Sequence, residues 1–268
     1  MLVLIGAVGG LVLGIVEGPN WGWGSDRVLG CFVAALVLGL VFLRRCARHP
    51  APVLELALLR ERSFAAANVV MVLFFVAFGA MLLNGVLFLT QVWDHSNLRA
   101  GLELAVGPAT VVGVSFVSRR LVERVGARTV VALGALCFVV ASVWWRLRLG
   151  ATPSYAGAFV PAMFLSGAGV GLTQPTLFGV ASAALPPARL STGTAILNMS
   201  RQIGMAIGVA VVVGILGAGA PTLRALHDNF VAMALCAAAC GVAALALMRP
   251  RERASAVPAE AAARVPAA

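Results

Sequence analysis

One segment of the sequence places three polar side chains inside an otherwise apolar run. Asn198, Arg201 and Gln202 are spaced so that they share one face of a helix. An unpaired guanidinium inside a membrane costs several kcal/mol, so we expect Arg201 to face protein or water. Two interpretations stay open. Arg201 either contacts a transported substrate, or it pairs structurally or extends toward the membrane surface.

Other side-chain amides interrupt apolar segments elsewhere. Asn84 and Gln91 are seven residues apart and therefore share a helical face, and Gln174 directly precedes Pro175. Amides beside an interrupted helix suit the lining of a transport pathway, and hydrogen bonds between helices explain them equally well. The candidate pathway residues are Asn84, Gln91, Gln174, Asn198, Arg201 and Gln202.

Acidic residues are scarce in the apolar segments. Glu103 lies near the end of one, where hydration is the simplest expectation, and it is the one acid that we consider for proton transfer. The neighbouring pairs Asp94 with His95 and His227 with Asp228 are expected to be solvated loop residues rather than metal ligands. The apolar segments contain no nucleophile with a base, phosphate loop, paired carboxylates or zinc motif, so the sequence indicates neither an enzyme nor a cofactor or metal site.

The composition indicates what kind of molecule positions these residues. Of 268 residues, 61% are hydrophobic and 11% are charged, and the mean hydropathy is +0.98. A water-soluble domain carries roughly a quarter charged residues, so these values indicate a protein embedded in a lipid bilayer. Every basic residue apart from histidine is arginine, and the arginines lie in short groups between apolar runs. This pattern favours topology signals over nucleic-acid binding.

The apolar runs predict the fold class. A helix needs about 20 apolar residues to cross a bilayer. The sequence therefore predicts an all-α, polytopic membrane bundle of about eight transmembrane helices. The expected spans are 2–16, 28–43, 64–89, 102–117, 129–145, 155–185, 192–216 and 230–248. The sixth contains Pro161 and Pro175 and is too long for one straight crossing, so we expect it to tilt, bend or leave the bilayer.

These spans divide the chain into four parts. Residues 1–43 are expected to form two helices, 44–63 a cytoplasmic amphipathic connection, 64–248 a six-helix bundle and 249–268 a disordered tail. The arginines concentrate in 44–62, 119–128, 189 and 249–264, which places both termini in the cytoplasm. All five tryptophans then fall on the outer side.

Glycine patterns indicate where helices approach one another closely. Gly10 with Gly14, and Gly204 with Gly208, are four residues apart, and Gly167-Ala-Gly-Val-Gly171 lies in the sixth span. Small residues at this spacing allow two helix backbones to come into contact.

Several short motifs follow one another in a characteristic order. They are Trp21-Gly-Trp23, the stretch Pro52–Phe64, Leu89-Thr-Gln91 followed by Ala100-Gly-Leu102 and Pro108, then Glu123, Arg124, Gly126 and Arg128, and finally Gly193, Asn198, Arg201, Gln202, Gly204 and Gly208. In this order they resemble the carboxyl-terminal part of a major facilitator superfamily transporter. The similar branch is that of the fourteen-span drug:proton antiporters, which export quaternary ammonium compounds and other lipophilic cations. Glu123 replaces the usual Asp of its cytoplasmic loop, and Met205 stands where a second Gly is common.

This resemblance implies a function and a missing partner. It implies two central linker helices in 1–43, and exchange of amphipathic drugs for protons across a bacterial cell (inner) membrane. The family's amino-terminal six-helix bundle, with the acids expected to couple protons, has no counterpart in the sequence. Because transport in this fold rocks one bundle against the other, we expect the chain alone to be inactive. The alternative is a nontransporting membrane scaffold or assembly partner.

Overall fold

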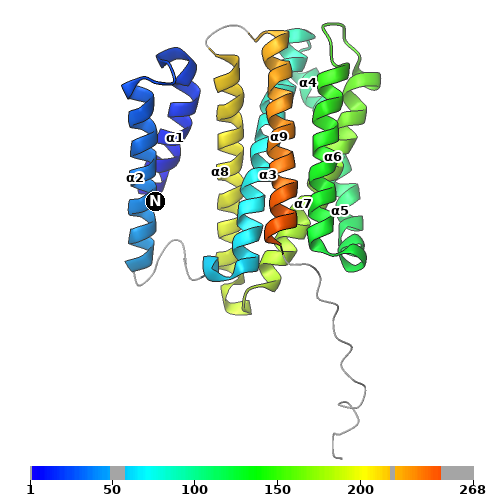
Figure 1. The fold of residues 1–268 in the computed structure, drawn as a ribbon. Helices are drawn as coiled ribbons and strands as arrows, with labels where there is room; N and C mark the ends of the chain where they lie inside the picture. The colour runs from blue at the N-terminus through cyan, green and yellow to red at the C-terminus, as the bar shows by residue number, and fades with distance from the viewer. Residues whose placement is uncertain (1, 49–57, 218–220, 249–268) are drawn as a thin grey trace, which may run out of the picture.

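The computed structural model describes residues 2–48, 58–217 and 221–248, and every element in these ranges is a helix. Long helices that follow one another in the chain run in opposite directions (Figure 1). Seven helical segments of the described chain are long and apolar enough to cross a membrane. With α2 (Asp26–Arg48), they confirm the predicted all-α bundle of about eight membrane helices. Residues 49–57 of the predicted connection and the whole predicted tail lie outside the described residues.

The first two helices form a hairpin at the edge of the molecule. α1 (Leu2–Trp21) packs along α2, and α1 also contacts α8 (Leu190–Leu216) (Figure 1). A Cβ atom on Gly14 would lie 2.9 Å from a ring carbon of Phe32, and one on Gly214 of α8 would lie 2.9 Å from the carbonyl oxygen of Ile15. Glycine therefore permits both close approaches, as predicted for the Gly10 and Gly14 pair.

The remaining helices form a second group. They are η1 (Leu58–Arg60), α3 (Arg62–Leu87), the π-helical turn η2 (Phe88–Val92), α4 (Asn97–Leu104), α5 (Val106–Val125), α6 (Ala127–Arg148), the π-helical turn η3 (Tyr155–Phe159), α7 (Val160–Ala183), η4 (Pro187–Arg189), α8 and α9 (Leu223–Leu247). α3 is the most deeply buried long helix, and its Phe74 meets Phe138 of α6 edge to face at 5.3 Å between ring centroids. The core of this group lies around α3.

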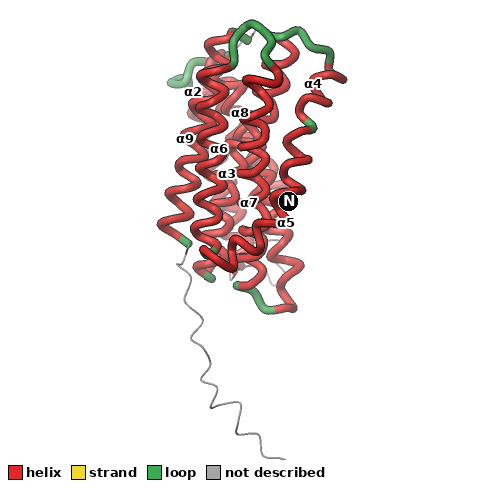
Figure 2. Tube along the Cα trace, turned by 90° about the vertical axis from the view of Figure 1, so that its right-hand side faces the viewer, coloured by secondary structure: helices red, strands yellow, loops and turns green. Residues whose placement is uncertain are grey.

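The fourth predicted span differs most from the observed helices. We predicted 102–117, whereas the helical segment covers Asn97–Val125 and is interrupted at Ala105, between α4 and α5. Figure 2 shows this interruption near one end of the bundle. An apolar-run prediction stops at the first arginine, but an amphipathic helix continues past it. α5 ends at Val125 and is followed by Gly126, whose φ of 85° is one that L side chains rarely adopt; α6 starts at Ala127.

The sixth predicted span, 155–185, is helical as far as Ala183. η3 and α7 together cover Tyr155–Ala183, a segment of 29 residues. Pro161 lies in the first turn of α7, where a missing N–H removes no hydrogen bond within that helix. Pro175 lies inside α7 and removes one. The helix nevertheless continues through Pro175 to Ala183.

The other two glycine predictions are also confirmed. A Cβ on Gly204 would lie 2.6 Å from the carbonyl oxygen of Val72, which shows that α8 touches the backbone of α3. A Cβ on Gly167 would lie 2.8 Å from the carbonyl oxygen of Gly107, so α7 touches α5 in the same way. These contacts set the spacing of the helices that surround the candidate site.

The two ends of the molecule differ in composition. We call the end at which α1, α3, α6 and α8 finish the tryptophan end, because all five tryptophans lie there in helix termini or turns (Figure 1). α2, α5, α7 and α9 finish at the opposite end. The connections between consecutive long helices therefore alternate between the two ends of the molecule, as the sequence predicts for the two sides of a membrane.

Candidate functional site: a cavity between α3, α5, α7 and α8

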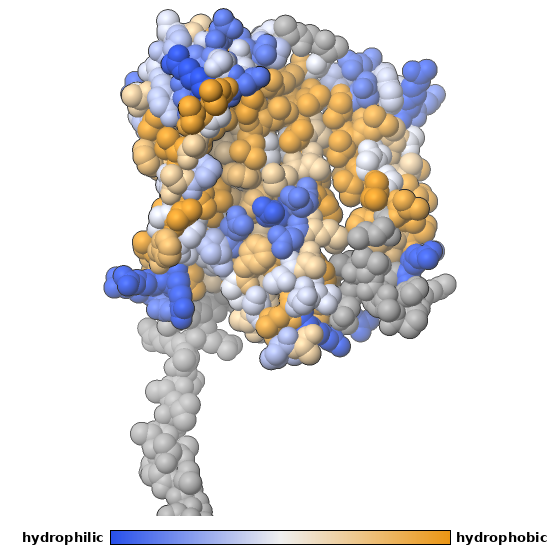
Figure 3. All heavy atoms as spheres, turned by 180° about the vertical axis from the view of Figure 1, so that it is seen from behind, coloured by the Kyte–Doolittle hydropathy of each residue, from blue (hydrophilic) through white to orange (hydrophobic). Residues whose placement is uncertain are grey.

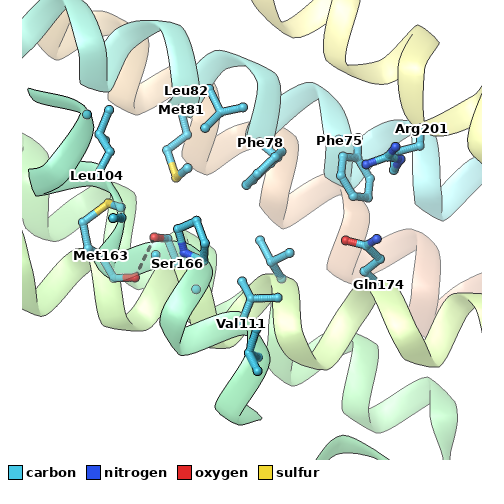
Figure 4. A pocket seen from close by; sticks show the side chains of 17 residues that line it. Phe75, Phe78, Met81, Leu82, Leu104, Val111, Met163, Ser166, Gln174 and Arg201 are labelled. Carbon is cyan, nitrogen blue, oxygen red and sulfur yellow. Dashed lines mark hydrogen bonds between the residues drawn. The ribbon is translucent and has the colours of Figure 1, made fainter. Parts of the chain in front are cut away.

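The bundle contains a cavity of about 590 Å³. This volume lies within the range of sites that bind small molecules. The lining is mostly apolar, and Figure 4 shows side chains from several helices converging on it. Its large apolar residues are Phe75, Phe78, Met81 and Leu82 of α3, Leu104 of α4, Val111 and Val112 of α5, and Met163 and Val170 of α7.

Small residues make room for this cavity. Gly101, Ala105 and Gly107 line it from the α4 and α5 side, and Gly167 lines it from α7. A Cβ on Gly107 would come within 2.8 Å of the terminal methyl carbon of Met163. Glycine at this position therefore leaves space for the flexible Met163 side chain, a residue type that adapts to irregular surfaces.

Arg201 and Gln174 supply the main polar groups of the lining. Arg201 of α8 and Gln174 of α7 are both half-buried and point toward the same region (Figure 4). The guanidinium carbon of Arg201 lies 5.7 Å from the centroid of the Phe75 ring, within the range of a cation–π contact. Its Nε is buried, with no hydrogen-bond partner among the described residues. These are the two predicted pathway residues that the structure brings together.

Asn198 and Gln202 do not line the cavity. Both side chains are exposed on α8, and the Asn198 amide donates to the carbonyl oxygen of Thr194 in its own helix at 3.0 Å. Residues four apart lie nearly above one another, so 198 and 202 share one edge of α8 while Arg201 turns toward the cavity. Figure 3 shows a hydrophilic patch inside the largely apolar band on the face turned away from the viewer in Figure 1. On α8 the side chains of Asn198 and Gln202 are exposed, whereas that of Arg201 is half-buried.

Asn84 and Gln91 lie away from the cavity. Asn84 is fully buried, donates to the carbonyl oxygen of Leu226 at 3.2 Å and accepts from the Asn229 amide at 3.1 Å. It therefore ties α3 to α9, which was one of the two explanations given for the amides. Gln91 is exposed in η2 at the tryptophan end. A role of either residue in transport stays a prediction.

Glu103 is buried, contrary to the expected hydration. Its carboxylate lies 2.8 Å from Nδ1 of His95 and accepts from Nε of Arg99 at 3.0 Å. The Tyr155 hydroxyl donates to its backbone carbonyl at 2.9 Å. The side chains of Glu103 and His95 are only 9% and 7% exposed. The expectation that both are solvated is therefore wrong.

A local backbone reversal explains this burial. Asp94 has a positive φ of 53°, a conformation that Asp tolerates better than most residues. Ser96 then caps α4 by accepting from the Arg99 backbone N–H at 3.3 Å. This turn carries His95 back onto the helix that presents Arg99 and Glu103 four residues apart. The Asp and Ser that form this turn could be recognised from the sequence, but the contact with the distant Tyr155 could not be predicted from it.

The second predicted acid and imidazole pair is divided by the fold. Asp228 is exposed, whereas His227 is half-buried, with Nε2 2.9 Å from the carbonyl oxygen of Leu149 and its ring stacked on Phe88. The expectation of a solvated loop is therefore wrong for His227. The indole N–H of Trp93 donates to the carbonyl oxygen of Gly150 at 3.0 Å. Together these contacts join the connection after α6 to the start of α9 and to the turn before α4 at the tryptophan end.

The predicted cytoplasmic loop motif forms a very tight turn. Glu123 and Arg124 are exposed in the last turns of α5, Gly126 makes the turn, and Arg128 lies in the first turn of α6. The carboxylate of Glu123 accepts from Nε of Arg119 at 3.4 Å on the surface. The motif lies at the end of the molecule opposite to the tryptophans (Figure 1).

Comparison with known proteins is consistent with this architecture. A sequence model described as "Major Facilitator Superfamily" matches residues 69–268. Over 218 residues the chain is 33% identical to the "Multidrug resistance protein Stp" of Mycobacterium tuberculosis, covering 81% of this chain and 40% of that protein. The "Methylenomycin A resistance protein" of Streptomyces coelicolor is 27% identical over 96% of this chain and 54% of its own length. The "Tetracenomycin C resistance and export protein" of Streptomyces glaucescens is 29% identical over 79% and 39%.

The chain thus spans about half the length of these relatives, or less. The family match covers most of the chain, and the fold supplies the long apolar helices that such a match requires. The chain belongs to the Major Facilitator Superfamily and is a multi-pass membrane protein.

Proposed function

We propose that this chain forms one helical bundle of a proton-coupled exporter of amphipathic drugs. The observation that carries the proposal is the mostly apolar cavity with Arg201 and Gln174 on its wall, in a member of a transporter superfamily. The names of the relatives, which refer to drug resistance and export, support this class of cargo. Family membership also supports a function other than catalysis.

The proposal includes a second bundle that faces the cavity. Transporters of this fold work by rocking one bundle against another around a shared site. The chain spans about half the length of these relatives or less, which supports a longer whole. With about six further spans, that whole has fourteen. In this arrangement, residues 1–43 are the two central helices, 44–63 the cytoplasmic connection and 64–248 the carboxyl-terminal bundle. The chain by itself then does not transport.

The first test is the DNA sequence directly upstream of the Met1 codon. An open reading frame in phase that encodes about six further spans supports the proposal. The longer protein is then expressed in drug-sensitive bacteria and compared with residues 1–268 alone. Export of amphipathic dyes by the longer protein, and none by the shorter one, is the expected result. A stop codon in phase without a neighbouring half-gene, together with a stable complex with an unrelated protein, would instead support a scaffold.

The proposed orientation places both termini in the cytoplasm of a bacterial cell. The distribution of arginine supports this orientation, because short cytoplasmic loops are enriched in basic residues. Green fluorescent protein fused after Ala268 should fluoresce, and alkaline phosphatase fused at the same position should be inactive. Fusions after Asn97, at the tryptophan end, should show the reverse pattern. An active phosphatase at the carboxyl terminus would overturn the orientation.

We further propose that Glu103 takes part in proton coupling. Its support is a buried carboxylate that lies 2.8 Å from the imidazole of His95 at the tryptophan end. In inverted vesicles containing the longer protein, Glu103→Gln should reduce dye transport driven by a pH gradient and leave dye binding unchanged. Asp228→Asn, which alters an exposed acid at the same end, is the matched control. Undiminished proton-driven transport by Glu103→Gln would exclude this role.

A further inference from the structure

The lining of the cavity carries a net positive charge. Arg201 is part of the wall, and the described lining residues include no Asp or Glu. The buried Nε of Arg201 has no hydrogen-bond partner in the described part of the chain. A buried polar N–H without an acceptor is unfavourable, and an acceptor on a ligand would relieve that cost. The site therefore favours a ligand that brings an electron-rich group to Arg201.

The aromatic neighbour of Arg201 also favours a ligand with a negatively charged group over one with a positively charged group. Exposed aromatic faces attract ligand cations such as quaternary ammonium groups. In this cavity the Arg201 guanidinium lies 5.7 Å from the Phe75 ring centroid and already covers that ring. A cationic head group in this region would meet the guanidinium charge, whereas a carboxylate matches the two parallel N–H donors of arginine.

The polar and apolar parts of the cavity are separated. Figure 4 shows Arg201 and Gln174 together in one region, while Met81, Leu104 and Met163 lie together in another. An amphiphile fits this arrangement with its head group at Arg201 and its apolar body beside the methionines. The Gln174 amide can donate a hydrogen bond to the same head group.

Building on the proposed function, we propose that the cargo is an amphiphile with an anionic head group, such as a carboxylate. Arg201 binds the head group and Gln174 orients it. This assignment differs from the lipophilic cations that the family resemblance implies. An anionic lipid has the same chemistry as such a cargo, so the test separates the two sources.

The test compares three naphthalenes that differ in head group. They are 1-naphthaleneacetate, the neutral 1-naphthaleneacetamide and (1-naphthylmethyl)trimethylammonium. Binding of each to the full 268-residue chain is measured by calorimetry in nanodiscs of zwitterionic lipid. We expect the acetate to bind about tenfold more tightly than the cation. Addition of phosphatidylglycerol to the nanodiscs should leave acetate binding in place. Loss of acetate binding when phosphatidylglycerol is added would assign the site to a lipid head group and overturn the cargo proposal.

Variants of Arg201 connect this preference to the structure. Arg201→Gln should weaken acetate binding about tenfold and change acetamide binding less than about twofold. Arg201→Lys keeps the charge and should keep part of the preference. Arg224→Gln, which removes an exposed arginine outside the cavity, is the matched control and should have no effect. Circular dichroism and size-exclusion chromatography show whether each variant is folded.

Each remaining outcome has a defined meaning. Equal binding of all three compounds to the unchanged chain, or a preference that survives in Arg201→Gln, overturns the anionic head group but leaves the cavity as a binding site. Absence of binding by all three overturns the inference as well. The proposed function fails by a separate criterion, which is that the longer protein exports no dye of any charge.

Discussion

Asn84 and Asn198 carry the same amide, but the fold uses them differently. Asn84 is fully buried and bonded to two residues of α9, whereas Asn198 is exposed and bonded to its own helix. Both occur in apolar runs, so the sequence could not separate them. The difference arises from which neighbouring helix each residue faces, and that depends on contacts between residues far apart in the chain.

This difference predicts unequal effects on stability. Asn84→Leu removes both contacts and leaves the Asn229 amide without its partner on α3. The free energy of unfolding should fall by about 0.5–2 kcal/mol, the range for such bonds between membrane helices. Asn198→Leu is the control and should change stability by less than about 0.5 kcal/mol. Unfolding by dodecyl sulfate in mixed micelles measures both, and equal effects would contradict the structural assignment of Asn84.

The position of Arg201 could be predicted only in part from the spacing of residues in the sequence. The interval from Asn198 to Gln202 correctly indicated that these residues lie near each other on one helix. The cost of an unpaired charge predicted that Arg201 faces protein or water, and its guanidinium lies over the Phe75 ring. Spacing could not show which of the three side chains turns inward, because that choice depends on where α3 and α7 pack. Phe75, the closest aromatic partner, is 126 residues away in the sequence and carried no signal of its own.

At the level of the helices, most of the fold was predictable. The observed helices contain the apolar runs because crossing a bilayer requires a long helix with satisfied backbone groups. The ends were less predictable. α9 begins at Leu223, seven residues before the expected Phe230, and α5 extends to Val125. Both extensions contain charged residues, which an apolar-run criterion excludes although a helix tolerates them near the membrane surface.

The contact between α8 and α3 predicts a strong effect of one methyl group. Gly204→Ala would place a Cβ 2.6 Å from the carbonyl oxygen of Val72. Because this oxygen belongs to the backbone of α3, relieving the clash requires a whole helix to move. We expect a loss of about 1–3 kcal/mol in stability. At Gly113 of α5, an added Cβ would meet no atom within 4 Å, so Gly113→Ala should be neutral or stabilise by up to about 1 kcal/mol. Thermal unfolding in detergent compares the two, and a neutral Gly204→Ala would show that these helices lie further apart.

At the scale of the whole molecule, the hairpin of α1 and α2 lies to one side of the other helices (Figure 1). Its main described contact with them is that of α1 along α8. The family resemblance implied two linker helices beside a six-helix bundle, but it gave no information on which helix joins them. The contact between Gly214 of α8 and Ile15 of α1 could not be predicted from the sequence, because the two residues lie far apart in the chain.

This arrangement predicts that the second group of helices folds without the hairpin. A protein that starts with Met followed by residues 58–268 should remain helical and should bind 1-naphthaleneacetate within about twofold of the full chain, because the cavity lining comes from residues 75–201. Circular dichroism and the calorimetric assay measure the two properties. Loss of either would show that α1 and α2 are part of the same folding unit as the cavity.

The position of the tryptophans gives the protein an intrinsic optical marker. All five lie at one end, and three of their indole N–H groups donate to backbone carbonyls there, at Gly150, Ala158 and Phe159. Ultraviolet fluorescence therefore arises from that end alone, while the opposite end is dark at the same wavelengths. When water enters the tryptophan end, the emission should shift to longer wavelength, and opening of the other end should leave the spectrum unchanged. The unlabelled chain can thus report which of its two ends is open.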